Sequence, residues 1–385
     1  MSQRSNWNYP TSVRFGAGRI AELADACKAN GIERPLLVTD PGLAGLPMTQ
    51  MAFGSLKAAG LGAAMFSDIR SNPVDSNVEA GVRAMRAGLH DGVVAFGGGS
   101  ALDVGKVIAF MSGQSRPMWD FEDVGDWWTR ADPKGIAPVI AVPTTSGTGS
   151  EVGRAGVITH AASHTKKVIF HPKMMPVVTI CDPVLTVGLP PAITAATGMD
   201  AFSHCLEAYC APGFHPLADG LAVEGMRLVS ENLVRAVTRG DDLEARGNMM
   251  AAGAMGATAF QKGLGAMHAL SHPVGAVHDT HHGLTNAVFM PYVLVFNRKA
   301  IEGRIARLSA YLGLEPSFDA FLAHVLALRQ AVGIPPTLVG LKVGPEKAGL
   351  IAEMAVVDPT AGGNPVPLDV AGARTIFENA LYGRL

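Results

Sequence analysis

The chain contains 385 residues, of which 48% are hydrophobic and 17% are charged, and its formal net charge at pH 7 is −2. This length is enough for two domains with separate cores, and this composition excludes an intrinsically disordered chain. Because the sequence has no long basic or acidic run, it gives no sign of the charged surface by which proteins bind nucleic acid.

The sequence carries no recognisable targeting or membrane signal. Residues 1–7 lack the apolar core of a signal peptide, and no stretch approaches the roughly 18 unbroken apolar residues of a membrane helix. The cysteines form neither a disulfide framework nor a complete zinc knuckle; they are Cys27, Cys181, Cys205 and Cys210. We therefore expect a cytoplasmic protein with no membrane partner.

Residues 1–189 alternate short apolar runs with helical patterns. Helices are predicted at residues 20–29 and 78–89, and strands at residues 35–39, 62–66, 92–96 and 138–142. This alternation predicts a parallel sheet covered by helices on both faces. Further β-rich pieces lie within residues 155–182, where we expect a hairpin near the sheet edge.

The character of the sequence changes at the pair Pro190-Pro191. Strand signals fade there, and helical periodicity continues to residue 385. Apolar residues can share one helix face within residues 217–237 and again within residues 318–332. We therefore predict an α/β first domain at residues 1–189 and an all-α second domain at residues 190–385.

A glycine run follows the third predicted strand. Gly97-Gly98-Gly99-Ser100 leads from this strand into a helical pattern at residues 101–111. Glycines at such a turn let phosphate approach the backbone, and the helix N-terminus offers free N–H groups. The run is neither a G-x-G-x-x-G fingerprint nor a Walker loop, so by itself it is equally typical of a tight structural turn.

A second loop strengthens the nucleotide interpretation. Residues 144–150 (TTSGTGS) follow another apolar strand, and ligands of α/β sheets bind at the carboxyl ends of strands. Asp40 follows the first predicted strand, where a carboxylate accepts from a ribose 2′-OH and repels a 2′-phosphate, which favours NAD over NADP. An isolated Asp at a strand end is also a common helix N-cap.

One carboxylate and several imidazoles lie in apolar, glycine-rich parts of the second half. Asp200 and His204 are four residues apart and share a face on a helix, and His268 and His272 repeat this spacing. Three more histidines follow: His278, His281 and His282. These donors suit a divalent transition metal better than Mg²⁺ or Ca²⁺, although spacing does not decide which histidines bind. The pattern is not HExxH, which excludes a zincin protease.

Taken together, these segments resemble the iron-dependent (group III) alcohol dehydrogenase family over nearly the whole chain. Four segments carry the resemblance: residues 97–106 (GGGSALDVGK), 143–152 (PTTSGTGSEV), 198–209 (GMDAFSHCLEAY) and 263–283, which begin GLGAMHALSHP. The resemblance implies an α/β dinucleotide-binding domain followed by an all-α metal-binding domain, an architecture that dehydroquinate synthases share.

The resemblance also implies roles for individual residues. His272 would be a catalytic histidine near the substrate. The metal ligands, for Fe²⁺ or alternatively Zn²⁺, would be Asp200, His204, His268 and His282. The NAD contacts would be Asp40, Asn72, Gly98, Gly99, Ser100, Asp103, Thr144, Thr145, Thr148 and Lys167.

The implied function is NAD-dependent interconversion of a small primary alcohol and its aldehyde by a homodimer or larger homo-oligomer. One alternative is a semialdehyde or hydroxy acid, with Arg154 or Lys262 binding its carboxylate. Glycerol dehydrogenases and dehydroquinate synthases share the architecture, but the four-ligand set disfavours their reactions. An alternative of a different class is a nucleotide-binding regulator with a structural metal. His278 and His281 depart from the aromatic residue and proline that are common in relatives, and an extra imidazole there would compete for metal or alter proton transfer.

Overall fold

The structure is a computed structural model that describes residues 11–163 and 165–385. The chain divides into two compact units. The first contains the described residues of Tyr9–Thr145 and Gly149–Gly188, and the second contains Ser146–Thr148 and Leu189–Leu385. This division differs from the predicted boundary by one residue and by the short loop Ser146–Thr148, which groups with the helical unit.

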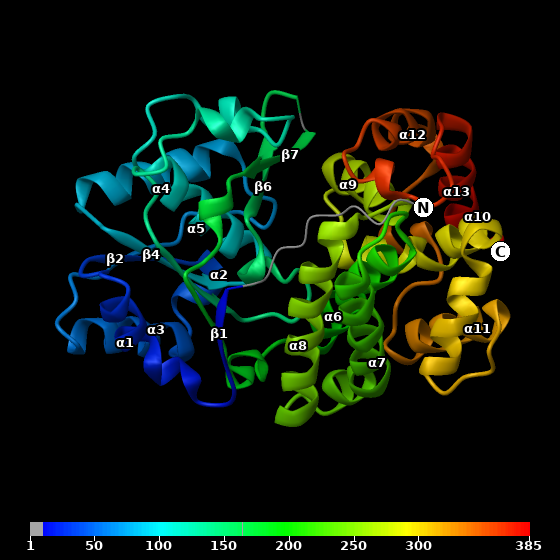
Figure 1. Cartoon of the computed structure of the whole chain (residues 1–385), viewed down its shortest axis with the longest axis horizontal. Helices are drawn as coiled ribbons and strands as arrows, with labels where there is room; N and C mark the ends of the chain where they lie inside the picture. Colours follow the sequence, from blue (N-terminus) through cyan, green and yellow to red (C-terminus); the bar gives the residue numbers. More distant parts are fainter. Residues whose placement is uncertain (1–10, 164) are drawn as a thin grey trace. The chain divides into compact units, whose positions relative to one another are not determined.

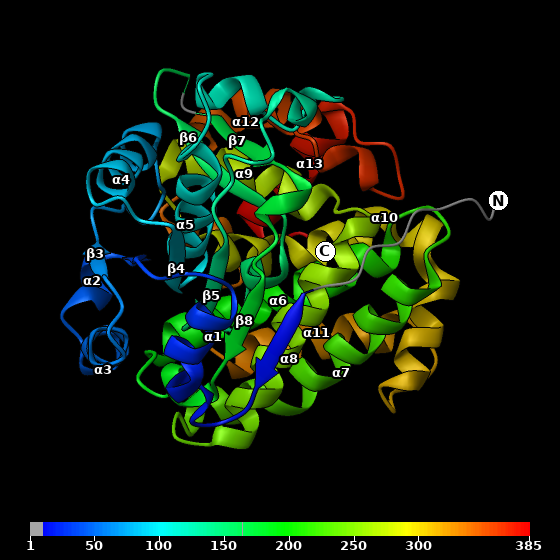
Figure 2. The ribbon, with the colours of Figure 1, turned by 60° about the vertical axis from the view of Figure 1, so that its left-hand side comes forward.

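The first unit is built on a six-stranded sheet in which all neighbouring strands run parallel. Its order from one edge to the other is β3-β2-β4-β5-β8-β1, and the labels β3, β4, β5 and β8 follow that order in Figure 2. The strands are β1 (Ser12–Phe15), β2 (Pro35–Val38), β3 (Ala64–Phe66), β4 (Gly92–Gly97), β5 (Val139–Pro143) and β8 (Val178–Cys181). The predicted parallel sheet is therefore confirmed.

Helices cover both faces of this sheet (Figure 1). Along β4, Val94 and Phe96 pack toward α1 (Leu23–Ala29) and α3 (Pro47–Ala58), in one core. The alternate residues Val93 and Ala95 pack toward the opposite face, where α4 (Asp75–Ala87) and α5 (Gly99–Met111) lie. Because successive side chains of a strand point to opposite faces, a continuous apolar run supplies both cores.

The β-rich segment after residue 154 contains the expected hairpin. Strands β6 (Ala155–His160) and β7 (Thr165–Phe170) pair antiparallel and form a two-stranded sheet of their own. The third β-rich piece is not part of the hairpin, because β8 pairs with β1 and β5 in the main sheet.

The second unit is helical. Its helices are α6 (Pro191–Cys210), α7 (Pro216–Thr238), α8 (Leu243–Ala259), α9 (Ala266–His278), α10 (His282–Tyr311), α11 (Phe318–Ala331), α12 (Ala348–Val356) and α13 (Val370–Tyr382). Helix α6 is central, since every residue from Thr194 to Cys210 is buried. A helix that is buried on all sides needs small residues where its neighbours approach; a Cβ at Gly198 would lie 2.3 Å from Leu233 Cδ1 of α7.

The remaining helices are short. They are α2 (Pro41–Ala44) and the 3₁₀ helices Arg19–Glu22, Met118–Phe121, Trp127–Arg130, Ser150–Val152, Pro172–Met174, Pro183–Thr186, Phe260–Lys262, Leu338–Leu341, Pro345–Lys347 and Ala361–Gly363. Within the described ranges, none of the helices combines the length and the apolar character that spanning a bilayer requires.

Candidate metal centre

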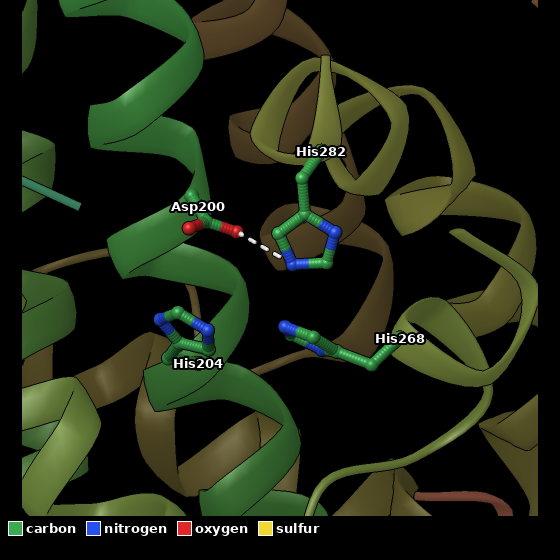
Figure 3. Close-up of side chains that lie close together, drawn as sticks. All are labelled: Asp200, His204, His268 and His282. Atoms are coloured by element: carbon green, nitrogen blue, oxygen red, sulfur yellow. Dashed lines mark ion pairs between the residues drawn. The ribbon is translucent and has the colours of Figure 1, made fainter. Parts of the chain in front are cut away.

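Four side chains from three helices converge inside the helical unit. Asp200 and His204 project from one face of α6, one turn apart, as their spacing predicts. His268 is the third residue of α9, and His282 is the first residue of α10. Each of the four offers one ligand atom, and these atoms all lie within 4.8 Å of one another. In Figure 3 the four side chains point toward one another from their separate helices.

The amide of Asn286, one turn into α10, marks the point on which three of these four atoms converge. Its Nδ2 lies 2.9 Å from Asp200 Oδ1, 3.1 Å from His268 Nε2 and 3.2 Å from His282 Nε2. Asp200 Oδ1 and His282 Nε2 are themselves 3.7 Å apart. Three potential ligand atoms from three segments therefore lie within 3.2 Å of one nitrogen atom, and such close approach of an oxygen and two imidazole nitrogens is what a divalent cation also requires.

The environment keeps His204 neutral. Burial lowers the pKa of His204 to about 4, and the nearby carboxylate of Asp200 only partly opposes this effect. Its ring lies over that of His268, with centroids 4.8 Å apart and planes at 21°. A neutral imidazole retains the lone pair that a metal needs.

His268 has a buried carboxylate behind it. Glu207 Oε2 lies 2.6 Å from His268 Nδ1, and Glu207 Oε1 accepts a 2.7 Å hydrogen bond from the Met267 backbone N–H. Burial lowers the pKa of His268, but the charge and hydrogen bond of Glu207, together with the charges of Asp200 and Asp358, outweigh burial and raise it overall. Sequence reasoning did not identify Glu207, although its place seven residues after Asp200 puts both on one helix face.

His272 stands beside the four-residue cluster without belonging to it. Its ring stacks on that of His282, with centroids 5.3 Å apart and planes at 15°. Its Nδ1 lies 2.9 Å from Asp358 Oδ2, and the other Asp358 oxygen accepts from the N–H and hydroxyl of Thr360. Burial raises the pKa of Asp358, but these hydrogen bonds outweigh burial and hold it below the ordinary value. Asp358 is 86 residues from His272, so no local sequence signal connects them.

The other two histidines of this region have different surroundings. His281 is the N-cap of α10, and its Nδ1 accepts a 3.4 Å hydrogen bond from Leu284 N–H. His278 ends α9, and its buried Nε2 has no hydrogen-bond partner among the described residues. Neither is a member of the four-residue cluster.

Several predicted NAD contacts gather at the carboxyl ends of β2, β4 and β5. Thr144 N–H donates to Gly97 O at 3.0 Å, and a Cβ at Gly98 would lie 3.3 Å from Thr145 Cγ2. A Cβ at Gly97 would lie 3.6 Å from Asp40 Oδ2. Asp40 is also the N-cap of α2, because its Oδ1 accepts from Leu43 N–H at 3.0 Å.

The glycine run opens α5 as expected. Gly98 is the N-cap and Gly99 is the first residue of the helix. Ser100 Oγ donates to Ser71 O at 2.6 Å, which ties this turn to the loop that contains Asn72. The glycine run, the start of the second loop at Thr144 and Thr145, and the Asn72 segment are thus connected within the first unit.

Three other predicted NAD residues are placed differently. Asp103 links α5 to two other segments by hydrogen bonds. Its Oδ2 accepts from Val157 N–H of β6 at 3.0 Å, and its Oδ1 accepts from Ser150 Oγ at 2.5 Å. Lys167 Nζ pairs with Glu122 Oε2 at 2.6 Å. Thr148 belongs to the helical unit, whereas the other predicted NAD residues belong to the first unit.

Lys262, one of two candidates for binding a substrate carboxylate, already has an anionic partner. Its side chain is only 2% exposed, and its Nζ lies 2.6 Å from Asp219 Oδ1. Arg304 pairs with the other oxygen of Asp219 at 2.6 Å. The second candidate, Arg154, places its guanidinium 5.5 Å from the centroid of the Phe170 ring.

Comparison with protein families gives matches over both units. Residues 10–183 match the family described as iron-containing alcohol dehydrogenase. Residues 194–381 match the C-terminal region of the Fe-containing alcohol dehydrogenase family. The two matches together cover most of the chain.

Individual proteins agree with these matches over nearly their full lengths. The 4-hydroxybutyrate dehydrogenase of Cupriavidus necator is 38% identical, with 97% of this chain and 99% of that protein aligned. The NAD-dependent methanol dehydrogenase of Bacillus methanolicus is 34% identical, with 98% and 100% aligned. A crystal structure of 1,3-propanediol oxidoreductase superposes with a TM-score of 0.92 at 34% identity, covering 98% of this chain and 100% of that one.

Proposed function

The chain belongs to the iron-containing alcohol dehydrogenase family, and from this premise we propose that it interconverts a small primary alcohol and its aldehyde with NAD(H). It is an NAD-dependent oxidoreductase. The strongest structural support for the proposal is the convergence of one carboxylate and three imidazoles in the helical unit of a chain from this family.

The residues that would hold the metal are Asp200, His204, His268 and His282. One carboxylate and three imidazoles suit both Fe²⁺ and Zn²⁺, and the family favours Fe²⁺. A divalent ion in such a site supplies Lewis-acid chemistry to a hydroxyl or carbonyl group. The donor set fits this role because potential ligand atoms of three of its members already lie close to one point.

The residues proposed to hold NAD are Asp40, Asn72, Gly98, Gly99, Ser100, Asp103, Thr144, Thr145, Thr148 and Lys167. The bonds between Thr144 and Gly97, and between Ser100 and Ser71, support a shared binding edge for part of this set. The N-terminus of α5 supplies backbone N–H groups for phosphate. The carboxylate of Asp40 disfavours a 2′-phosphate, and so selects NAD.

His272 is proposed to move the proton that accompanies hydride transfer. The bond from Nδ1 to Asp358 fixes the ring and leaves Nε2 to exchange a proton. We expect His272→Ala to lower kcat by about 10²-fold or more, the usual contribution of a general acid–base. Metal content should stay at the wild-type level, because His272 is outside the four-residue cluster. Steady-state kinetics with metal analysis of the same sample checks both expectations, and His324→Ala, at a histidine paired with Ser230, is the control.

Removal of the metal tests the whole proposal. We expect the protein stripped with a chelator to lose NADH oxidation with every aldehyde in a panel, and to recover it when Fe²⁺ or Zn²⁺ is added. Wild-type turnover by fully stripped protein would contradict the proposal. Absence of NADH oxidation with any aldehyde, in protein that retains its metal, would favour the nucleotide-binding regulator instead.

A carboxylated substrate is the weaker alternative. A relative named for 4-hydroxybutyrate supports it, but Lys262 in this chain is already neutralised by Asp219. The same aldehyde panel separates the two, because a carboxylate-binding site would give a higher kcat/KM for semialdehydes than for neutral aldehydes of equal length.

The setting of the enzyme is also proposed. All four cysteines are free and buried, which supports a reducing cytoplasm. The net charge of −2 supports an enzyme whose partners are small molecules rather than nucleic acid or a membrane. A homodimer or larger homo-oligomer rests on the family resemblance, and light scattering in solution would determine it.

A further inference from the structure

Glu207 is a buried carboxylate whose two oxygens face two different donors. It lies on α6 one turn after His204 and is only 5% exposed. One oxygen accepts from Met267 N–H at 2.7 Å, and the other lies 2.6 Å from His268 Nδ1. A single side chain therefore contacts the first turn of α9 and the imidazole that α9 presents to the cluster.

This geometry decides which nitrogen of His268 carries the proton. A carboxylate can only accept, so the contact at Nδ1 requires an N–H there, and in the neutral ring this leaves the lone pair on Nε2. Nε2 is the atom that faces the convergence point, 3.1 Å from Asn286 Nδ2. In metal sites, a carboxylate behind a histidine sets the tautomer and the ring orientation in this way.

The start of α9 has a second anchor that does not involve Glu207. Asn364 Oδ1 accepts from Ala266 N–H at 3.2 Å, and Asn364 forms a reciprocal amide pair with Asn297. The Ala266 N–H at the start of α9 is therefore bound by the asparagine pair without any contribution from Glu207. For His268 Nδ1, by contrast, Glu207 is the hydrogen-bond partner, and the described residues provide no second one.

We propose that Glu207 is a positioning residue that holds His268 as the Nδ1-protonated tautomer and aims its Nε2 at the metal. The inference rests on the proposed metal site, since it assigns Glu207 the task of orienting one ligand of that site. Glutamine cannot replace Glu207, because the Met267 N–H and the Nδ1–H of His268 both donate to this side chain and an amide offers only one acceptor atom. If the amide nitrogen faces Nδ1, the His268 proton must move to Nε2, where it blocks metal binding.

The first experiment measures metal affinity by chelator competition with Zn²⁺ on the full-length stripped protein. Glu207→Gln is expected to weaken binding by about 10–100-fold, as loss of an outer carboxylate does in other sites. The same change made in a His268→Ala background should cause no further loss, because its effect passes through His268. Asp358→Asn is the matched control: it also replaces a carboxylate behind an imidazole, but His272 is not in the cluster, so affinity should be unchanged.

The second experiment reads the tautomer directly in the metal-free protein. With ¹⁵N-labelled histidine and neutral imidazole, the wild type should show His268 protonated at Nδ1, and Glu207→Gln should shift the proton toward Nε2. Glu207→Asp serves as a rescue variant that keeps the charge and both acceptors, and it should retain the wild-type tautomer. Circular dichroism establishes that each variant is folded.

The outcomes separate this inference from the proposed function. Equal Zn²⁺ affinity of wild type and Glu207→Gln, or wild-type His268 protonated at Nε2, would overturn the role of Glu207. If Glu207→Gln reduced Zn²⁺ affinity as much in the His268→Ala background as in the wild type, the role would be overturned too, since the effect would not pass through His268. A wild-type protein that binds no Zn²⁺ or Fe²⁺ would instead overturn the metal site, and the tautomer result would still stand by itself.

Discussion

Replacing Asp200 with alanine is expected to abolish metal binding and NADH turnover together. Asp200 supplies the only carboxylate among the four clustered side chains, and it is buried. Loss of an outer partner alone typically costs about 10–100-fold in affinity, so loss of a charged ligand should cost more than about 100-fold. Turnover should fall by about 10³-fold or more, which corresponds to the several kcal/mol that a Lewis acid contributes at about 1.4 kcal/mol per tenfold.

Metal content and kcat must be measured on the same sample for this test. Asp319→Ala removes an exposed carboxylate of the same unit, which pairs with Arg298, and should change neither quantity. If Asp200→Ala retained full metal content, the cluster would not be the site. If it lost the metal but kept turnover, the metal would have no part in the reaction.

Gly283→Ala is expected to destabilise the helical unit and weaken the metal site at once. Gly283 follows His282 at the start of α10, where this helix crosses α6 closely. An added Cβ would lie 2.4 Å from Ala196 O and 2.8 Å from Asp200 Cβ. Backbone and a short side chain cannot move aside, so α10 must shift and carry His282 away from Asp200. Overpacking of this kind costs about 1–3 kcal/mol, and we expect metal affinity to fall at least about 10-fold.

The same helix provides the control. Gly303 lies in the exposed part of α10, and an added Cβ there would meet nothing within 4 Å. Because alanine is the better helix former, Gly303→Ala should stabilise the protein by up to about 1 kcal/mol and leave metal affinity unchanged. Thermal unfolding of metal-free protein, with chelator competition for affinity, compares the pair. Equal behaviour of the two variants would show that the close crossing at Gly283 does not control the site.

Local patterns were sufficient to predict most of the sheet. The strands found at residues 35–38, 92–97 and 139–143 are continuous apolar runs, because both of their faces are buried. Strand β1 escaped prediction because it is an edge strand whose residues are largely exposed, so Ser12 and Arg14 dilute the apolar signal. The place of β8 in the main sheet, between β1 and β5, was also missed, since these partners are distant in sequence.

Some residues of the candidate site could likewise be predicted from local spacing, whereas others depend on contacts between segments that are distant in sequence. The pair Asp200 and His204 was visible as an i, i+4 spacing on one helix. The addition of His268 and His282 came from the family resemblance, because their approach to α6 depends on how three helices pack. Glu207 had a local signal in its spacing from Asp200 that was not used, whereas the partnership of Asp358 with His272 had none.

All four members of the cluster lie within Leu189–Leu385, on helices of a single compact unit. On the proposed ligand assignment, the entire set of protein ligands lies inside one compact unit, so retention of the ion does not require the dinucleotide-binding half to contribute a donor. The coenzyme must leave and return in every catalytic cycle, whereas the metal can remain through all of them. On that assignment, the helical unit can keep its iron while the coenzyme exchanges at each turnover.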